Sequence, residues 1–333
     1  MAALSTEELA AAISSGNRRA LARGITLVES SREDHRNQAI DLLELLAKHA
    51  GGALRVAISG TPGVGKSTFI ESLGKYAIAD GNKIAVLAID PSSTLSGGSI
   101  LGDKTRMEIL AREQRAFIRP SPSGGTLGGV AARTREVILL CEAAGFNIVV
   151  VETVGVGQSE TMAAQMTDMF LLLLAPGGGD ELQGIKRGII ELADLILVNK
   201  ADGGLEDIAN KAVSEYRLAL QLIRSRSDHW DVGVAACSAL CDRGVAESWQ
   251  QICDYRRIMK ECGEIEIRRG AQAKSWLYAE INEVLGRRFR TNEKVRAEFQ
   301  SVEAAVMSGN LPPTTAALRL LDLFQPDDIN KKL

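Results

Sequence analysis

The residues Gly60–Ser67 read G-T-P-G-V-G-K-S and match the phosphate-binding pattern G-x-x-x-x-G-K-[ST]. The pattern follows an apolar run, Val56–Ser59, and opens a predicted helix. Its glycines let backbone N–H groups turn inward around a β-phosphate, and the helix N-terminus adds positive potential. We expect Lys66 to contact the β- and γ-phosphates and the Ser67 hydroxyl to ligate Mg²⁺. The predicted phosphate contacts are Gly60, Thr61, Pro62, Gly63, Val64, Gly65, Lys66, Ser67 and Thr68.

A second motif, Asn199-Lys200-Ala201-Asp202, follows the apolar run Leu195–Val198. An aspartate there can accept hydrogen bonds from guanine N1–H and N2–H₂, whereas adenine would leave the carboxylate unpaired. Such a site can discriminate by about 10⁴-fold. We expect Asn199 to brace the loop and the aliphatic stem of Lys200 to cover the base. A further loop, predicted to place its backbone on guanine O6, contains Ser238, Ala239 and Leu240.

Acidic residues lie at or near the ends of other predicted strands. Glu152 ends the run 148–151, Asp90 ends the run 84–89, and Asp103 lies in a polar loop. Because Mg²⁺ prefers oxygen ligands, Asp90, Asp103 and Glu152 could surround it together with Ser67. Two alternatives stay open: Asp90 as a turn residue before a proline, and Asp103 as a helix N-cap. Gly155 is in register for its N–H to sense a γ-phosphate.

The residue that orients the attacking water is not evident from the sequence. Val156 stands where Ras-like proteins keep a glutamine, and Gln158 could substitute for it. Without a placed glutamine or arginine, intrinsic hydrolysis should be slow, on the order of 10⁻⁴–10⁻² s⁻¹. Glycine-rich segments at 91–102, 121–129 and 177–186 are predicted to reorder around the γ-phosphate, or else are ordinary solvent loops.

Short apolar runs alternate with helical patterns between residues 54 and 237. Several runs are apolar at nearly every position, which is typical of parallel strands covered on both faces. The pattern predicts an α/β fold, a doubly wound and mostly parallel sheet. We expect a helical extension at 1–52, the α/β domain at 53–262 and a helical arm at 263–333.

Composition excludes several classes of protein. The 333 residues carry 39 Lys and Arg against 42 Asp and Glu, which argues against binding to nucleic acid. No apolar run reaches the roughly 18 residues that span a membrane, and the N-terminus lacks the features of a secretion signal. Five cysteines indicate a reducing compartment, and we expect a cytoplasmic protein. Cys237, at a predicted strand end, is expected to be buried as a small apolar residue.

The motifs together resemble those of the MeaB/ArgK-type G proteins, which include the mitochondrial MMAA proteins. The resemblance covers nearly the whole chain, and its most specific part is Gly97–Met107. The matching segments are Gly60–Thr68, Asp90–Ser93, Gly97–Met107, Glu152–Glu160 and Asn199–Asp202.

This resemblance implies a P-loop GTPase core in a homodimeric chaperone of adenosylcobalamin-dependent methylmalonyl-CoA mutase. Such proteins bind GTP and GDP with Mg²⁺, gate cofactor loading by hydrolysis, and protect the mutase, which accelerates their slow turnover. It also implies that Gly177–Lys186 is a switch that communicates with the mutase, and that the C-terminal helices form the dimer contact. The implied phosphate and Mg²⁺ centre is Lys66, Ser67, Asp90, Asp103 and Glu152, and the implied guanine site is Asn199, Lys200 and Asp202.

Two rival functions have less support in the sequence. A nickel-insertion GTPase would need histidine or cysteine ligands, yet the chain has three histidines and no histidine-rich tract. A GTPase that targets proteins to membranes would need a methionine-rich or apolar groove, which seven scattered methionines do not supply. The sequence therefore favours the mutase chaperone.

Overall fold

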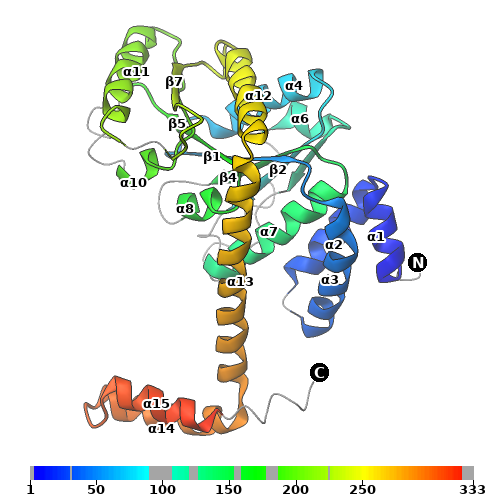
Figure 1. Cartoon of the computed structure of the whole chain (residues 1–333), viewed down its shortest axis with the longest axis vertical. Helices are drawn as coiled ribbons and strands as arrows, with labels where there is room; N and C mark the ends of the chain where they lie inside the picture. Colours follow the sequence, from blue (N-terminus) through cyan, green and yellow to red (C-terminus); the bar gives the residue numbers. More distant parts are fainter. Residues whose placement is uncertain are drawn as a thin grey trace. The chain divides into compact units, whose positions relative to one another are not determined.

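The computed structural model describes residues 4–30, 32–89, 107–119, 127–153, 159–177, 187–223 and 226–324 (Figure 1). Several residues discussed above lie outside these ranges, among them Asp90, Asp103, Gly155 and Gln158. Val156 and most of the three glycine-rich segments also lie outside them.

Within the described ranges, seven parallel strands form one sheet, in the order β3-β2-β4-β1-β5-β6-β7. The predicted doubly wound α/β fold is therefore confirmed. The first strand lies in the middle, so the winding direction reverses beside it, and ligands bind outside the carboxyl ends of strands at such a point. The strands are β1 (Leu54–Gly60), β2 (Ile84–Ile89), β3 (Ala116–Arg119), β4 (Ile148–Thr153), β5 (Met169–Leu174), β6 (Leu195–Val198) and β7 (Gly233–Ala236).

Helices lie against the sheet, and this explains the continuous apolar runs. Every residue of β2, β4, β5 and β6 is buried, as strands covered on both faces require. The helices of the α/β region are α4 (Lys66–Ala79), α6 (Glu108–Arg112), α7 (Leu127–Ala143), α8 (Ser159–Ala164), α10 (Arg187–Ile190), α11 (Glu206–Leu220) and α12 (Val245–Glu261).

The N-terminal segment folds into three helices, α1 (Thr6–Ser14), α2 (Arg18–Glu29) and α3 (Glu33–Leu46), followed by a 3₁₀ turn at Ala47–His49. Ser5 and Glu8 form a reciprocal capping box that satisfies two free N–H groups at the start of α1. The buried faces of these helices pack together and against α7 (Figure 1). The N-terminal segment is thus part of the same packed unit as the sheet.

The chain divides into two compact units, Met1–Gln272 and Ala273–Leu333, and the division falls within α13 (Glu264–Thr291). The first turns of α13 belong to the first unit, because Arg269 binds the Asp168 carboxylate through two nitrogens at 2.7 and 2.6 Å. The second unit also contains α14 (Glu293–Met307) and α15 (Pro313–Leu323), whose small core includes Val295 and Leu320. Among the described residues, no helix is long and apolar enough to cross a membrane.

Candidate functional site

The phosphate-binding pattern forms a tight turn between β1 and α4. Gly65 has a φ of +96°, and a Cβ added to it would lie 2.7 Å from the Asn199 amide nitrogen. A side chain at this position would therefore be strained and would also collide. The buried Lys66 ammonium donates to the carbonyls of Gly60 at 2.8 Å and Thr61 at 3.2 Å. The cation is thus held within the loop, where a phosphate oxygen could replace these carbonyl acceptors.

The first residues of α4 lie beside the end of β4. The Ser67 hydroxyl donates to Glu152 Oε1 at 3.1 Å, and Glu152 is buried. Strand pairing causes this meeting, since Ile58 of β1 lies opposite Glu152 of β4. A hydroxyl and a carboxylate are hard oxygen ligands, so this pair fits a Mg²⁺ ion.

The Asn199 side chain joins the phosphate loop to the loops that follow β6 and β7. Its amide nitrogen donates to the Val64 carbonyl at 2.9 Å, and its amide oxygen accepts from the Ala239 N–H at 3.0 Å. Only 2% of Asn199 is exposed, so both hydrogen bonds form away from water. The residue thereby braces two predicted nucleotide loops in addition to its own.

The predicted guanine-binding residues gather at the ends of β6 and β7. The buried Ser238 hydroxyl donates to Asp202 Oδ2 and accepts from the Cys241 N–H at 3.1 Å. Lys200 adopts a left-handed conformation with a φ of +63°. The Leu240 side chain is 80% exposed, so it is free to lie over a ligand. The structure therefore brings Asn199, Lys200, Asp202, Ser238, Ala239 and Leu240 to one region.

Two contributors were missed by sequence reasoning. The Ser72 hydroxyl of α4 donates to the Ala239 carbonyl at 3.0 Å, which holds the base loop against the phosphate-loop helix. Arg243 donates to the Ala201 carbonyl at 3.1 Å and so fixes the Asn199–Asp202 turn. Neither residue belongs to a motif. The sequence does show that Ser72 is a polar residue among the apolar positions of a predicted helix, but it does not show which group Ser72 binds.

Cys237 is buried, as expected. Desolvation raises the pKa of its thiol to about 12, so the sulfur is neutral at physiological pH. Because only 2% of Cys237 is exposed, its sulfur is not open to an ion from solvent, which makes it a poor candidate for a ligand of a metal-insertion function.

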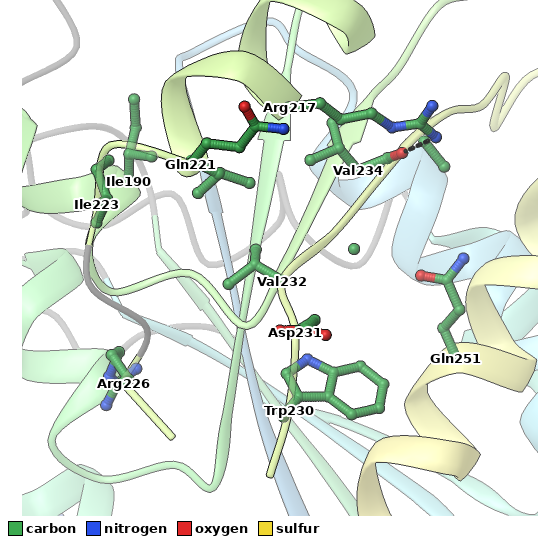
Figure 2. A pocket seen from close by; sticks show the side chains of 13 residues that line it. Ile190, Arg217, Gln221, Ile223, Arg226, Trp230, Asp231, Val232, Val234 and Gln251 are labelled. Carbon is green, nitrogen blue, oxygen red and sulfur yellow. Dashed lines mark hydrogen bonds between the residues drawn. The ribbon is translucent and has the colours of Figure 1, made fainter. Parts of the chain in front are cut away.

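A cavity of about 770 Å³ lies beside the edge strand β7, between α11 and α12 (Figure 2). Its walls include Gln221, Trp230 and Gln251, and Arg217 donates to the Val234 carbonyl at 2.8 Å. None of the predicted nucleotide contacts lines this cavity. The candidate nucleotide site is therefore the loop cluster at the carboxyl ends of the strands.

Replacing Asn199 by alanine should weaken guanine nucleotide binding by at least about tenfold. The substitution leaves the Val64 carbonyl and the Ala239 N–H without this partner, at about 1–3 kcal/mol for each buried group. Fluorescent GDP titration would measure the affinity, and urea unfolding would measure the stability. Asn310→Ala is the control, because its exposed amide donates only to the nearby Ser308 hydroxyl among the described contacts. Unchanged affinity in Asn199→Ala would show that the bracing is dispensable.

Comparison with known proteins agrees with this geometry. The family model described as "Methylmalonyl Co-A mutase-associated GTPase MeaB" matches residues 21–294. The Escherichia coli protein named GTPase ArgK is 45% identical, over 93% of this chain and 94% of its own length. The mouse methylmalonic aciduria type A homolog is 48% identical, over 93% of this chain and 77% of its own length. The crystal structure of a LAO/AO transport system kinase covers 98% of this chain and 99% of its own, with a TM-score of 0.77 and 37% identity. The fold is that of a P-loop GTPase, and the chain belongs to the MeaB family of methylmalonyl Co-A mutase-associated GTPases.

Proposed function

We propose that the protein hydrolyses GTP to GDP and phosphate as a chaperone that assists adenosylcobalamin loading and protection of methylmalonyl-CoA mutase. The observation that carries the proposal is the family match over residues 21–294, whose description names an association with this mutase. The loop cluster supports the nucleotide part of it, because phosphate and base motifs meet at one edge of the sheet.

Each proposed role follows from the chemistry of the side chain. Lys66 neutralises charge on the β- and γ-phosphates, and Asp202 accepts from the guanine N1–H and N2–H₂ donors. Ser67 and Glu152 would hold Mg²⁺, which when bound offsets phosphate charge during transfer. By family resemblance, Asp90 and Asp103 complete that centre, and Gly177–Lys186 is the switch toward the mutase. Gly155 stands where most GTPases have a glycine whose N–H contacts the γ-phosphate.

Family membership also weighs against the nickel-insertion alternative. The match extends over most of the chain, and no described contact of the nucleotide loops uses a histidine. We propose a cytoplasmic location, supported by five cysteines that form no disulfide with one another.

We further propose that residues 263–333 mediate a homodimer. Exposed apolar side chains recur every four residues along α13, at Leu277, Ile281 and Leu285, and so share one face of the helix. Contiguous apolar surface of this kind is typical of an interaction site.

Asp202→Asn should lower affinity for GDP by at least about a hundredfold and shift preference toward xanthosine nucleotides. The amide offers one acceptor in place of two, and its NH₂ group would pair with the xanthine C2 oxygen. Competition binding with GDP and XDP would measure the exchange. Asp207→Asn, an exposed acid in the first turn of α11, is the matched control. Unchanged guanine affinity would refute the assignment of Asp202.

GTP turnover by the full chain should rise at least about tenfold when purified methylmalonyl-CoA mutase is added, because a partner can supply groups that an incomplete site lacks. Phosphate release would be followed with and without the mutase. Lys66→Ala, which removes the loop cation, should abolish both rates. If turnover depends on Lys66 but does not change when the mutase is added, the GTPase assignment stands and the proposed partnership with the mutase is refuted.

Truncation after Gln272 should convert a dimer into a monomer that still binds GDP. The cut preserves Arg268 and Arg269, which hydrogen-bond to the core at Asp168. Light scattering would measure the mass of both forms. A dimer that survives the truncation would place the interface in the first unit.

A further inference from the structure

Three potential metal ligands meet at a place that the nucleotide chemistry does not use. His229, Cys262 and Glu264 each offer one ligand atom, and these atoms all lie within 4.8 Å of one another. His229 is exposed and Glu264 is half-buried, so the cluster is open to ions from solvent. A mixed set of nitrogen, sulfur and oxygen donors differs from the acidic clusters that are common on protein surfaces.

The junction between α12 and α13 brings two of these residues together. Cys262 is the C-cap of α12, and Glu264 is the first residue of α13. Between them Gly263 adopts a φ of +75°, a conformation that glycine reaches without strain. The Cys262 thiol donates to the Met259 carbonyl at 3.5 Å, and it loses little by giving up this contact because S–H is a weak donor.

The loop that carries His229 packs against α12. The Trp230 ring packs edge-on against Tyr255 of α12 at 5.1 Å, and its Nε1–H donates to the Asp194 carbonyl at 2.8 Å. On the other side, the Ser227 hydroxyl accepts from the His229 N–H at 3.1 Å and lies 3.8 Å from the Met259 sulfur. Contacts on both sides of His229 therefore fix the backbone near Cys262, so little ordering remains for an ion to impose.

The donor set selects the class of metal. Imidazole, thiolate and carboxylate together suit Zn²⁺, which accepts four tetrahedral ligands at about 2.0–2.3 Å. Ligand atoms around such an ion lie about 3.3–3.8 Å apart, so rotation of the exposed side chains would close the site. Mg²⁺ prefers oxygen ligands alone and would not compete strongly.

We propose that His229, Cys262 and Glu264 form a Zn²⁺ site with water as the fourth ligand and with release of the Cys262 thiol proton to solvent. The site is separate from the nucleotide. Trp230, next to His229, hydrogen-bonds to Asp194, which lies just before the amino end of β6. The phosphate loop instead follows the carboxyl end of β1. The ion would link the loop before β7, through His229, to the α12–α13 junction, through Cys262 and Glu264. It would thereby hold the first turn of α13 in place.

Zinc uptake by the full chain tests the proposal, measured in the presence of GDP and excess Mg²⁺ so that the nucleotide site is occupied. We expect one Zn²⁺ per chain, by elemental analysis after dialysis and by competition with a chromophoric chelator. Each of three substitutions should weaken Zn²⁺ binding by at least about tenfold: His229→Gln, Cys262→Ser and Glu264→Gln. Loss of a residue that only hydrogen-bonds to a metal ligand already costs about tenfold or more in metal affinity, and loss of the ligand itself should cost at least as much.

Two matched variants serve as controls. His49→Gln removes an exposed histidine of the N-terminal segment, and Glu261→Gln removes an exposed acid one residue before Cys262. Both should bind Zn²⁺ like the unmodified chain. Equal uptake by all five variants would place the ion elsewhere and overturn the proposal, as would the absence of uptake by the unmodified chain.

Cobalt substitution gives a readout that does not depend on any variant's folding. Co²⁺ bound to the unmodified chain should show the visible bands of a tetrahedral ion and a near-ultraviolet band from thiolate-to-metal charge transfer. Absence of the charge-transfer band would mean that Cys262 is not a ligand and would overturn the site as proposed.

Discussion

The buried amide of Asn199 is the contact on which the candidate nucleotide site depends. It is the one described side chain seen to hydrogen-bond both the phosphate loop, at Val64, and the base loop, at Ala239. Ser72 ties the base loop to α4, and Asn199 ties it to the phosphate loop itself. Loops that are ordered in advance lose less entropy on binding a ligand. The amide fixes their separation in advance, and Gly65 permits the close approach that this requires. The predicted phosphate loop and the predicted base loop thus form one braced unit.

A second polar centre lies at the opposite ends of the strands. The Asp168 carboxylate pairs with Arg269, and Arg268 lies 3.4 Å from the Asp194 carboxylate oxygens. Burial raises the pKa of Asp194, while the positive charges of Arg268 and Arg226 oppose that rise. Removing one partner from a buried pair of this kind would leave an uncompensated charge, at a cost of about 3–5 kcal/mol. The two pairs join the start of α13 to the amino ends of β5 and β6.

The two ends of the sheet therefore favour different ions. At the carboxyl ends, Ser67 and Glu152 offer hard oxygen ligands suited to Mg²⁺. At the α12–α13 junction, imidazole, thiol and carboxylate offer a softer set that suits Zn²⁺. The scarcity of histidine, which disfavours a dedicated metal-insertion protein, does not prevent one histidine from completing a structural site.

The sequence by itself determined the strands, the doubly wound class, the phosphate loop and the guanine motif, because each is encoded by neighbouring residues. Periodicity and glycine spacing involve residues that are close together in the sequence, so these features can be predicted without knowing which distant residues pack against them. The tertiary structure alone decided which distant groups meet: Asn199 with Val64, Ser67 with Glu152, and Ser72 with Ala239. It also decided the meeting of His229 with Cys262 and Glu264. The physical reason is that these contacts follow from strand order and helix packing, which set distances between segments that no local pattern contains.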